Sequence, residues 1–133
     1  MIIPTEPIGS IPRTPELLSA SPADFSRAAH QALRDTIRRF EQTGSPVITD
    51  GEQTKPSFAT YPLDGLANLA PDGVVIPFED GHTRQLPRLT AGPFRYAVHA
   101  SQYLAAAKQL TELPIKQAVI SASALSLLYP AEG

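Results

Sequence analysis

Hydrophobic residues recur every three or four positions between residues 21 and 43, which is the spacing of one face of a helix. The stripe consists of Phe25, Ala28, Ala29, Leu33, Ile37 and Phe40. Ser21 and Pro22 precede it and are typical of a helix start, and Gly44 follows it in a position typical of a helix end. The pattern predicts a long helix from about Ser21 to Thr43.

Two short apolar runs flank this helix. The first is Pro7–Gly9, which we expect to be a brief strand end that opens into a loop at Ser10, and the second is Val47–Thr49. A strand, a long helix and a second strand are typical of a parallel βαβ unit. Because such crossovers are right-handed, we expect Ser10 and Glu52, which follow the two strands, to lie at the same edge of a sheet.

The remaining pattern predicts a hairpin, a second helix and a third strand. Apolar runs at Val74–Pro77 and Thr83–Leu89 flank a Glu-Asp-Gly-His turn, which predicts an inserted β-hairpin over residues 73–90. A helical stripe runs from about Pro93 to Leu113, and Ile115–Ile120 follows as a strand. Shorter helical turns are expected over Thr14–Ala20, Leu63–Leu69 and Ala124–Leu128. The predicted fold class is α/β with parallel βα units.

Composition narrows the function classes. The 133 residues carry a net charge of −2 without a basic run, which argues against a nucleic-acid surface and a membrane anchor. No apolar run approaches the ~20 residues of a membrane span. Pro4, Glu6 and Pro7 interrupt the apolar start, so we expect no signal peptide and a cytoplasmic protein. Because the chain has no cysteine, it forms neither disulfides nor thiolate metal sites of its own.

Candidate chemistry gathers where the second predicted strand ends, at Asp50-Gly51-Glu52. The carboxyl ends of parallel strands are where ligands bind in α/β proteins. Asp50 and Glu52 are two apart, so an extended backbone would place them on one face. Asp-Gly is also a common turn dipeptide, so a plain turn is the alternative. Gly9 and Ser10 offer a backbone N–H and a hydroxyl, which suit a carboxylate or a phosphate, although such loops are usually only connections.

Four segments resemble, in order, the catalytic barrel of cobalamin-independent methionine synthase. Pro7–Thr14 is similar to its Ile-Gly-Ser-Phe-Pro segment, and Asp50-Gly51-Glu52 stands where the family has His-Gly-Glu. Leu63–Gly65 resembles its Leu-Asp-Gly-Phe, and Pro114–Ser123 resembles its Pro-Val-Lys to Thr-Gly-Pro strand and loop. The resemblance implies that residues 1–133 are the amino-terminal part of a TIM-type (β/α)₈ barrel, incomplete with about three of the eight strands.

The same resemblance implies methyl transfer from a methyl-folate to the thiol of homocysteine, with zinc polarising that thiol. The substrate carboxylate would lie at the loop of Ile8, Gly9 and Ser10, and the substrate ammonium at Glu52 with Asp50 beside it. Ser121 and Ser123 are further loop contacts. The family's zinc ligands lie in the later half of the barrel, so this chain is expected to supply none of them and to be inactive in isolation.

Departures from the family pattern leave the substrate open. Asp50 replaces a histidine, Gln53 replaces an acid or alanine, and Ala122-Ser123 replaces Gly-Pro. One alternative is a zinc-dependent alkyltransferase acting on another small thiol, such as a sulfonated one. Another is a truncated, non-catalytic barrel fragment that assembles with itself or with the remainder of a barrel, because an incomplete barrel exposes strand edges.

Overall fold

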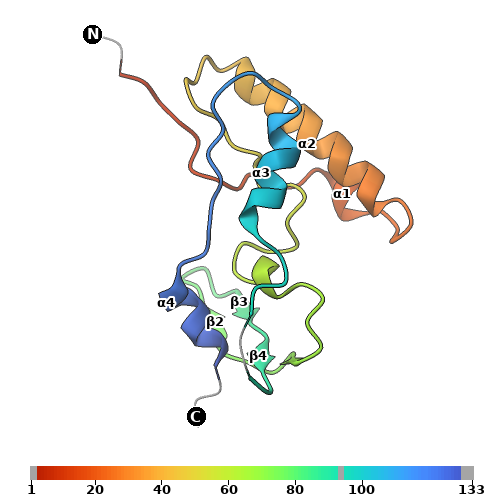
Figure 1. The fold of residues 1–133 in the computed structure, drawn as a ribbon, viewed down its shortest axis with the longest axis vertical. Helices are drawn as coiled ribbons and strands as arrows, with labels where there is room; N and C mark the ends of the chain where they lie inside the picture. The colour runs from red at the N-terminus through yellow and green to blue at the C-terminus, as the bar shows by residue number, and fades with distance from the viewer. Residues whose placement is uncertain (1–2, 93–94, 130–133) are drawn as a thin grey trace. The chain divides into compact units, whose positions relative to one another are not determined.

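The computed structural model describes residues 3–92 and 95–129. The chain divides into two units, which take their residues from 1–55 with 100–118 and from 56–99 with 119–133. The first unit contains helices α1 (Pro15–Leu18), α2 (Phe25–Glu41) and α3 (Ala100–Lys108) (Figure 1). The second unit contains η1 (Tyr61–Leu63), β1 (Leu69–Ala70), β2 (Val75–Pro77), β3 (Thr83–Gln85), β4 (Arg88–Leu89), α4 (Ala122–Leu125) and η2 (Ser126–Leu128).

Hydrogen bonds to a threonine and a serine just before them set where the first two helices begin. Thr14 Oγ1 accepts a hydrogen bond from Leu17 N at 3.3 Å, and this confirms the predicted cap of α1. The long helix begins later than predicted, because Ser21 Oγ accepts from Asp24 N at 3.2 Å and forms a separate turn. Gly44 follows α2 with φ of +73°, as a helix-ending glycine should.

Two apolar clusters hold the first unit together. One consists of Leu17, Ala29 and Ala32 and packs α1 against α2, and the other consists of Leu33, Ile37, Ile48 and Ala107. The predicted stripe is wrong at Phe25, whose exposed fraction is 41%. Phe25 starts the helix, one turn before Ala28 and Ala29, where contact with the α1 cluster begins.

The three extended segments of the first unit lie in the predicted order but form almost no ladder. Ile48 and Ile115 form a parallel bridge, in which Ile48 N donates to Pro114 O and Lys116 N donates to Ile48 O, both at 3.0 Å. On the other side, Ile11 N donates to Gly51 O at 3.1 Å. The parallel relation of the second and third segments is therefore observed.

Strand assignments for Pro7–Gly9 and for most of Ile115–Ile120 are nevertheless wrong, and Val47–Thr49 pairs only at Ile48. Pro7 and Pro114 have no backbone N–H to donate, which limits pairing near the start of two segments. The described residues combine helices with small sheets, which is consistent with an α/β fragment, and the barrel of parallel βα units stays a prediction.

The second unit contains the predicted hairpin as an antiparallel pair of β2 and β3, in which Ile76 lies opposite Arg84. β1 pairs antiparallel with β4. The expected helical turns over Leu63–Leu69 are wrong, since η1 ends at Leu63, where that range begins, and Gly65, with φ of +82°, interrupts it. That the hairpin is an insertion into a barrel stays a prediction.

The later helices match the sequence pattern in part. The predicted helix from Pro93 to Leu113 is shorter, and Pro93 itself lies outside the described residues. Ala97 N donates to Pro62 O at 2.7 Å, which takes Ala97 out of the helical pattern. Helices within residues 3–92 and 95–129 lack the combined length and apolar character that crossing a membrane requires.

The buried stripe of α2 gives a direct stability prediction. Leu33 is buried in the second cluster, whereas Leu18 of α1 is 70% exposed. We expect Leu33→Ala to lower the free energy of unfolding by about 2–5 kcal/mol, because it leaves a cavity. The matched control Leu18→Ala should change it by less than about 0.5 kcal/mol. Urea unfolding measures both, and equal effects would contradict the assigned core.

Candidate functional site

The Asp50–Gln53 segment is a tight turn with unusual backbone geometry. Gly51 and Glu52 have φ of +62° and +56°, and Gln53 N lies 3.5 Å from Asp50 O. Positive φ at both central positions defines a type I′ turn. Among the described residues, Glu52 is the one non-glycine residue with positive φ. Such strain costs about 1–3 kcal/mol and clusters at functional sites, so Glu52 is held in place by its surroundings.

Asp50 fixes this turn. Its buried carboxylate accepts from Glu52 N at 3.0 Å through Oδ1, and from Gln117 Nε2 at 3.1 Å through Oδ2. Gln117 belongs to the third extended segment, so Asp50 joins that segment to the turn. The structure thus gives Asp50 a local structural role, and its contact with a substrate stays a prediction.

Gly9 lies directly against the Glu52 carboxylate. A Cβ atom at Gly9 would lie 2.9 Å from Glu52 Oε1 and 3.5 Å from Ala118 Cβ. The first distance is shorter than carbon–oxygen van der Waals contact, so the absence of a side chain at residue 9 makes room for the carboxylate. The structure therefore brings together Gly9 and Glu52, which the sequence predicted to share a site.

Two polar side chains connect the Gly9 loop to the turn. Thr49 Oγ1 donates to Gly9 O at 3.0 Å and accepts from Gly51 N at 3.1 Å. Gln53 Nε2 donates to Ile11 O and to Gly51 O, each at 3.1 Å. Thr49 and Gln53 are both buried, so these hydrogen bonds form in surroundings with little competing water.

The Gly9 loop carries hydrogen-bond donors that no described residue uses. No described residue accepts a hydrogen bond from the backbone N–H of Gly9 or Ser10, or contacts the Ser10 hydroxyl. Ser10 is exposed, and the Ile8 side chain is 95% exposed, so any role of Ile8 in this loop falls to its backbone. These donors can bind an anion, as the sequence suggested for this loop.

Burial controls the electrostatics of Glu52 and Lys55. Burial raises the pKa of Glu52, Lys55 and Arg13 act to lower it, and Asp50 acts to raise it. Burial lowers the pKa of Lys55, while Glu52 and Asp50 act in the opposite direction. No described residue donates a hydrogen bond to the Glu52 carboxylate. A buried carboxylate of this kind is suited to a cationic ligand group.

Sequence reasoning did not single out Lys55. A lysine in a proline-containing loop is expected to be exposed, whereas Lys55 has an exposed fraction of 0%. Its position three residues after Glu52 is the one signal in the sequence that could have found it.

Ser121 and Ser123 belong to the second unit. Ser121 Oγ accepts from Ala124 N at 3.2 Å and caps α4, and it lies 3.0 Å from Ser123 Oγ. Their expected contact with a substrate stays a prediction.

The implied zinc finds no ligand set in this part of the chain. Within the described residues, no group of three or more His, Cys, Asp or Glu side chains is arranged to hold a metal ion. The sequence also contains no cysteine. The residues present therefore do not fit a zinc site, and none of the chemistry below is derived through one.

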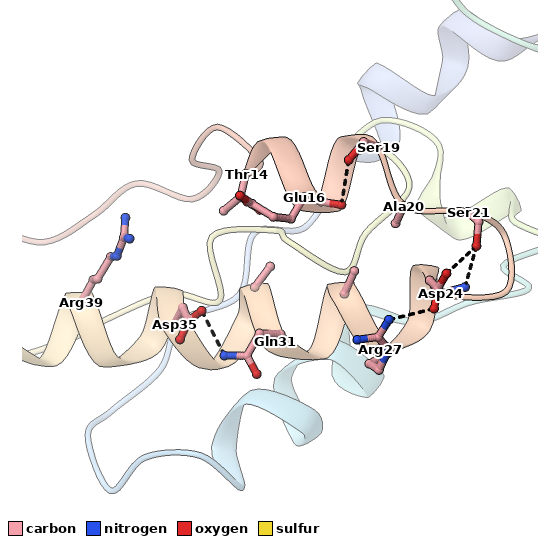
Figure 2. A pocket seen from close by; sticks show the side chains of 12 residues that line it. Thr14, Glu16, Ser19, Ala20, Ser21, Asp24, Arg27, Gln31, Asp35 and Arg39 are labelled. Atoms are coloured by element: carbon pink, nitrogen blue, oxygen red, sulfur yellow. Dashed lines mark hydrogen bonds and ion pairs between the residues drawn. The ribbon is translucent and has the colours of Figure 1, made fainter.

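A groove of about 770 Å³ is lined by residues of α1, α2 and the turn between them (Figure 2). None of the predicted site residues lines it. Several of its polar side chains pair with near neighbours in the sequence: Arg27 with Asp24 at 2.8 Å, and Gln31 with Asp35 at 3.1 Å. Because Arg27 and Asp24 are well exposed, we interpret the groove as hydrated surface.

Comparison with known proteins identifies a shared fold. No protein-family model matches the chain, and neither does any of the curated proteins. Among solved structures, it is similar to a B12-independent methionine synthase from Shewanella sp. W3-18-1, in complex with selenomethionine. The TM-score is 0.77 at 19% sequence identity, over 97% of this chain and 41% of that one. The chain therefore spans about two fifths of that protein and shares the fold of that part.

The raised pKa of Glu52 predicts a pH dependence of stability. Since the pKa in the folded protein exceeds the ordinary 4.5, the folded protein binds this proton more tightly than the unfolded chain. The contribution of Glu52 to the free energy of unfolding is therefore fully present below the ordinary pKa. It is lost as the pH rises from the ordinary pKa through the raised one. Glu52→Gln removes this loss, so the variant should gain stability relative to the wild type across that window.

Urea unfolding at a series of pH values measures the difference. The control is Glu112→Gln, which replaces an exposed glutamate. A stability difference between wild type and Glu52→Gln that stays constant with pH would contradict a buried, raised-pKa carboxyl.

Proposed function

We propose that this chain forms the amino-acid-binding part of a methyltransferase-type barrel resembling cobalamin-independent methionine synthase. Glu52 binds the ammonium group of homocysteine, and the loop of Ile8, Gly9 and Ser10 binds its carboxylate. The observation that carries the proposal is the contact between Gly9 and the Glu52 carboxylate, in which a Cβ at residue 9 would lie 2.9 Å from Oε1.

The two halves of the proposed site are complementary to a zwitterion. The α-ammonium and α-carboxylate of an amino acid share one carbon atom, so a receptor needs an acceptor and donors side by side. Glu52 supplies a charged acceptor, and the N–H groups of Gly9 and Ser10 with the Ser10 hydroxyl supply donors. Charge-assisted hydrogen bonds of this type are about twice as strong as neutral ones.

Burial of Glu52 favours an amino-acid thiol over a sulfonated thiol. Burial of a carboxylate costs hydration free energy, and a substrate ammonium would offset part of that cost beyond what Lys55 and Arg13 supply. A thiol that carries only a sulfonate offers no cation to Glu52. The selenomethionine in the structure of the similar methionine synthase supports a ligand of the methionine type.

The proposed role is limited to binding and orientation. Methyl-folate is the methyl donor that the family resemblance implies, and zinc would activate the thiol. Because the described residues contain no metal-ligand set, thiol activation is assigned to no residue of this chain. Binding is therefore a better readout than turnover.

Isothermal titration calorimetry of the natural full-length protein with L-methionine, L-homocysteine and 4-methylthiobutanoate tests the proposal. The last compound is methionine without its ammonium group. We expect Glu52→Gln to weaken methionine binding by about 2–5 kcal/mol, because it removes one partner of a buried charge pair. The same substitution should leave 4-methylthiobutanoate binding nearly unchanged, since that ligand makes no ion pair with Glu52.

Glu16→Gln is the control, because Glu16 lines the α1–α2 groove and is remote from Glu52 in sequence. Loss of methionine binding in Glu16→Gln but not in Glu52→Gln would place the ligand in the groove and contradict the proposal. Preferential binding of a sulfonated thiol such as 2-mercaptoethanesulfonate would instead favour an alkyltransferase of another substrate class.

A further inference from the structure

Lys55 is buried completely, which is exceptional for a lysine. Its ammonium group donates to Ala118 O at 2.7 Å and lies 5.6 Å from the centre of the Tyr103 ring. The distance to the ring falls within the range of a cation–π interaction. Ala118 belongs to the third extended segment and Tyr103 to α3, so one side chain links the loop after Glu52 to both.

The position of Lys55 follows from the turn that precedes it. Lys55 N donates to Glu52 O at 3.3 Å, and the Arg13 guanidinium donates to Lys55 O. The backbone of Lys55 is thus fixed by Glu52, three residues earlier, and by Arg13, which follows the Gly9 loop in the sequence. Its side chain then reaches Ala118, the residue whose Cβ borders Gly9.

Charge balance explains why a lysine stands here. Asp50 and Glu52 are two buried acids within three residues, and the charge of Asp50 acts against ionisation of Glu52. Lys55 is the buried cation nearest to them in sequence, and Arg13 is the other cation that acts on Glu52. An opposite charge nearby favours the carboxylate, which is the form that can bind an ammonium group.

We propose that Lys55 is the positioning residue of this site, whose buried ammonium balances the charge of Asp50 and Glu52 and holds the Glu52 turn against the third segment. The inference rests on the proposed function, in which Glu52 receives the substrate ammonium. Lys55 acts through Glu52 and needs no contact with the substrate.

Three substitutions separate charge from tethering. Lys55→Arg keeps a cation and a donor, Lys55→Gln keeps a donor without charge, and Lys55→Met keeps neither. Carbon-13 NMR of the Glu52 side-chain carboxyl measures its pKa in each variant. The pKa of Glu52 should rise in the Gln and Met variants and stay near the wild-type value in the Arg variant. A wild-type value in Lys55→Gln would reduce Lys55 to a structural tether and overturn the inference.

The reciprocal measurement covers the case in which Lys55 variants do not fold. In Glu52→Gln, the pKa of the Lys55 ammonium should fall below its wild-type value, because a neighbouring negative charge has been removed. An unchanged Lys55 pKa would show that the two groups do not interact, and it would overturn the inference independently.

Methionine calorimetry distinguishes this inference from the proposed function. In Lys55→Gln, methionine binding should weaken as the pH falls toward the raised pKa of Glu52. Relative to the wild type, the affinity should fall by up to about tenfold for each unit by which the substitution raises that pKa. A shifted Glu52 pKa with no methionine binding in the wild type would contradict the proposed function and leave the charge role of Lys55 standing. Methionine binding that depends on Glu52, with a Glu52 pKa that Lys55→Gln does not shift, would support the proposed function and contradict the charge role of Lys55.

Discussion

The candidate site depends on the burial of one carboxylate against one glycine. Glu52 reaches Gly9 because its backbone adopts a left-handed conformation and because residue 9 has no side chain. This arrangement has two costs to stability. A non-glycine residue at positive φ is strained, and a buried carboxylate loses hydration. Asp50, Thr49, Gln53 and Lys55 all make hydrogen bonds that hold the surrounding segments in this arrangement. Strained and desolvated groups of this kind cluster at functional sites, and the proposed substrate ammonium would offset the lost hydration of the Glu52 carboxylate.

A few backbone contacts bring the site together with very little regular sheet. A single bridge joins Ile48 to Ile115, and one backbone hydrogen bond joins Ile11 to Gly51. Side chains supply much of the remaining connection, since Thr49 and Gln53 bind the first segment and Asp50 binds Gln117 of the third. Leu33 and Ile37 of α2 pack in one cluster with Ile48, just before the turn in the sequence, and so support this arrangement.

The sequence predicted the parts of the fold that depend on local patterns. Thr14 as a cap, the α2 stripe from Ala29 to Ile37 and the β2–β3 hairpin all follow from spacing and turn residues. Strand extents failed at Pro7–Gly9 and after Ile115, where pairing depends on neighbours that periodicity does not reveal. At the site, the family resemblance predicted that Gly9 and Glu52 share a binding site, although the strand expected at Pro7–Gly9 did not form. The burial of Lys55 could not, since it depends on Ala118 and Tyr103, which are far away in the sequence.

Proton–proton distances between Gly9 and Glu52 test the central claim most directly. In a nuclear Overhauser spectrum of the natural polypeptide, the Glu52 side-chain methylene protons should show cross-peaks to the Gly9 α-protons, and the Glu52 backbone should show couplings typical of positive φ. A Glu52 side chain with no cross-peaks to residue 9, in a backbone of ordinary negative φ, would contradict the account.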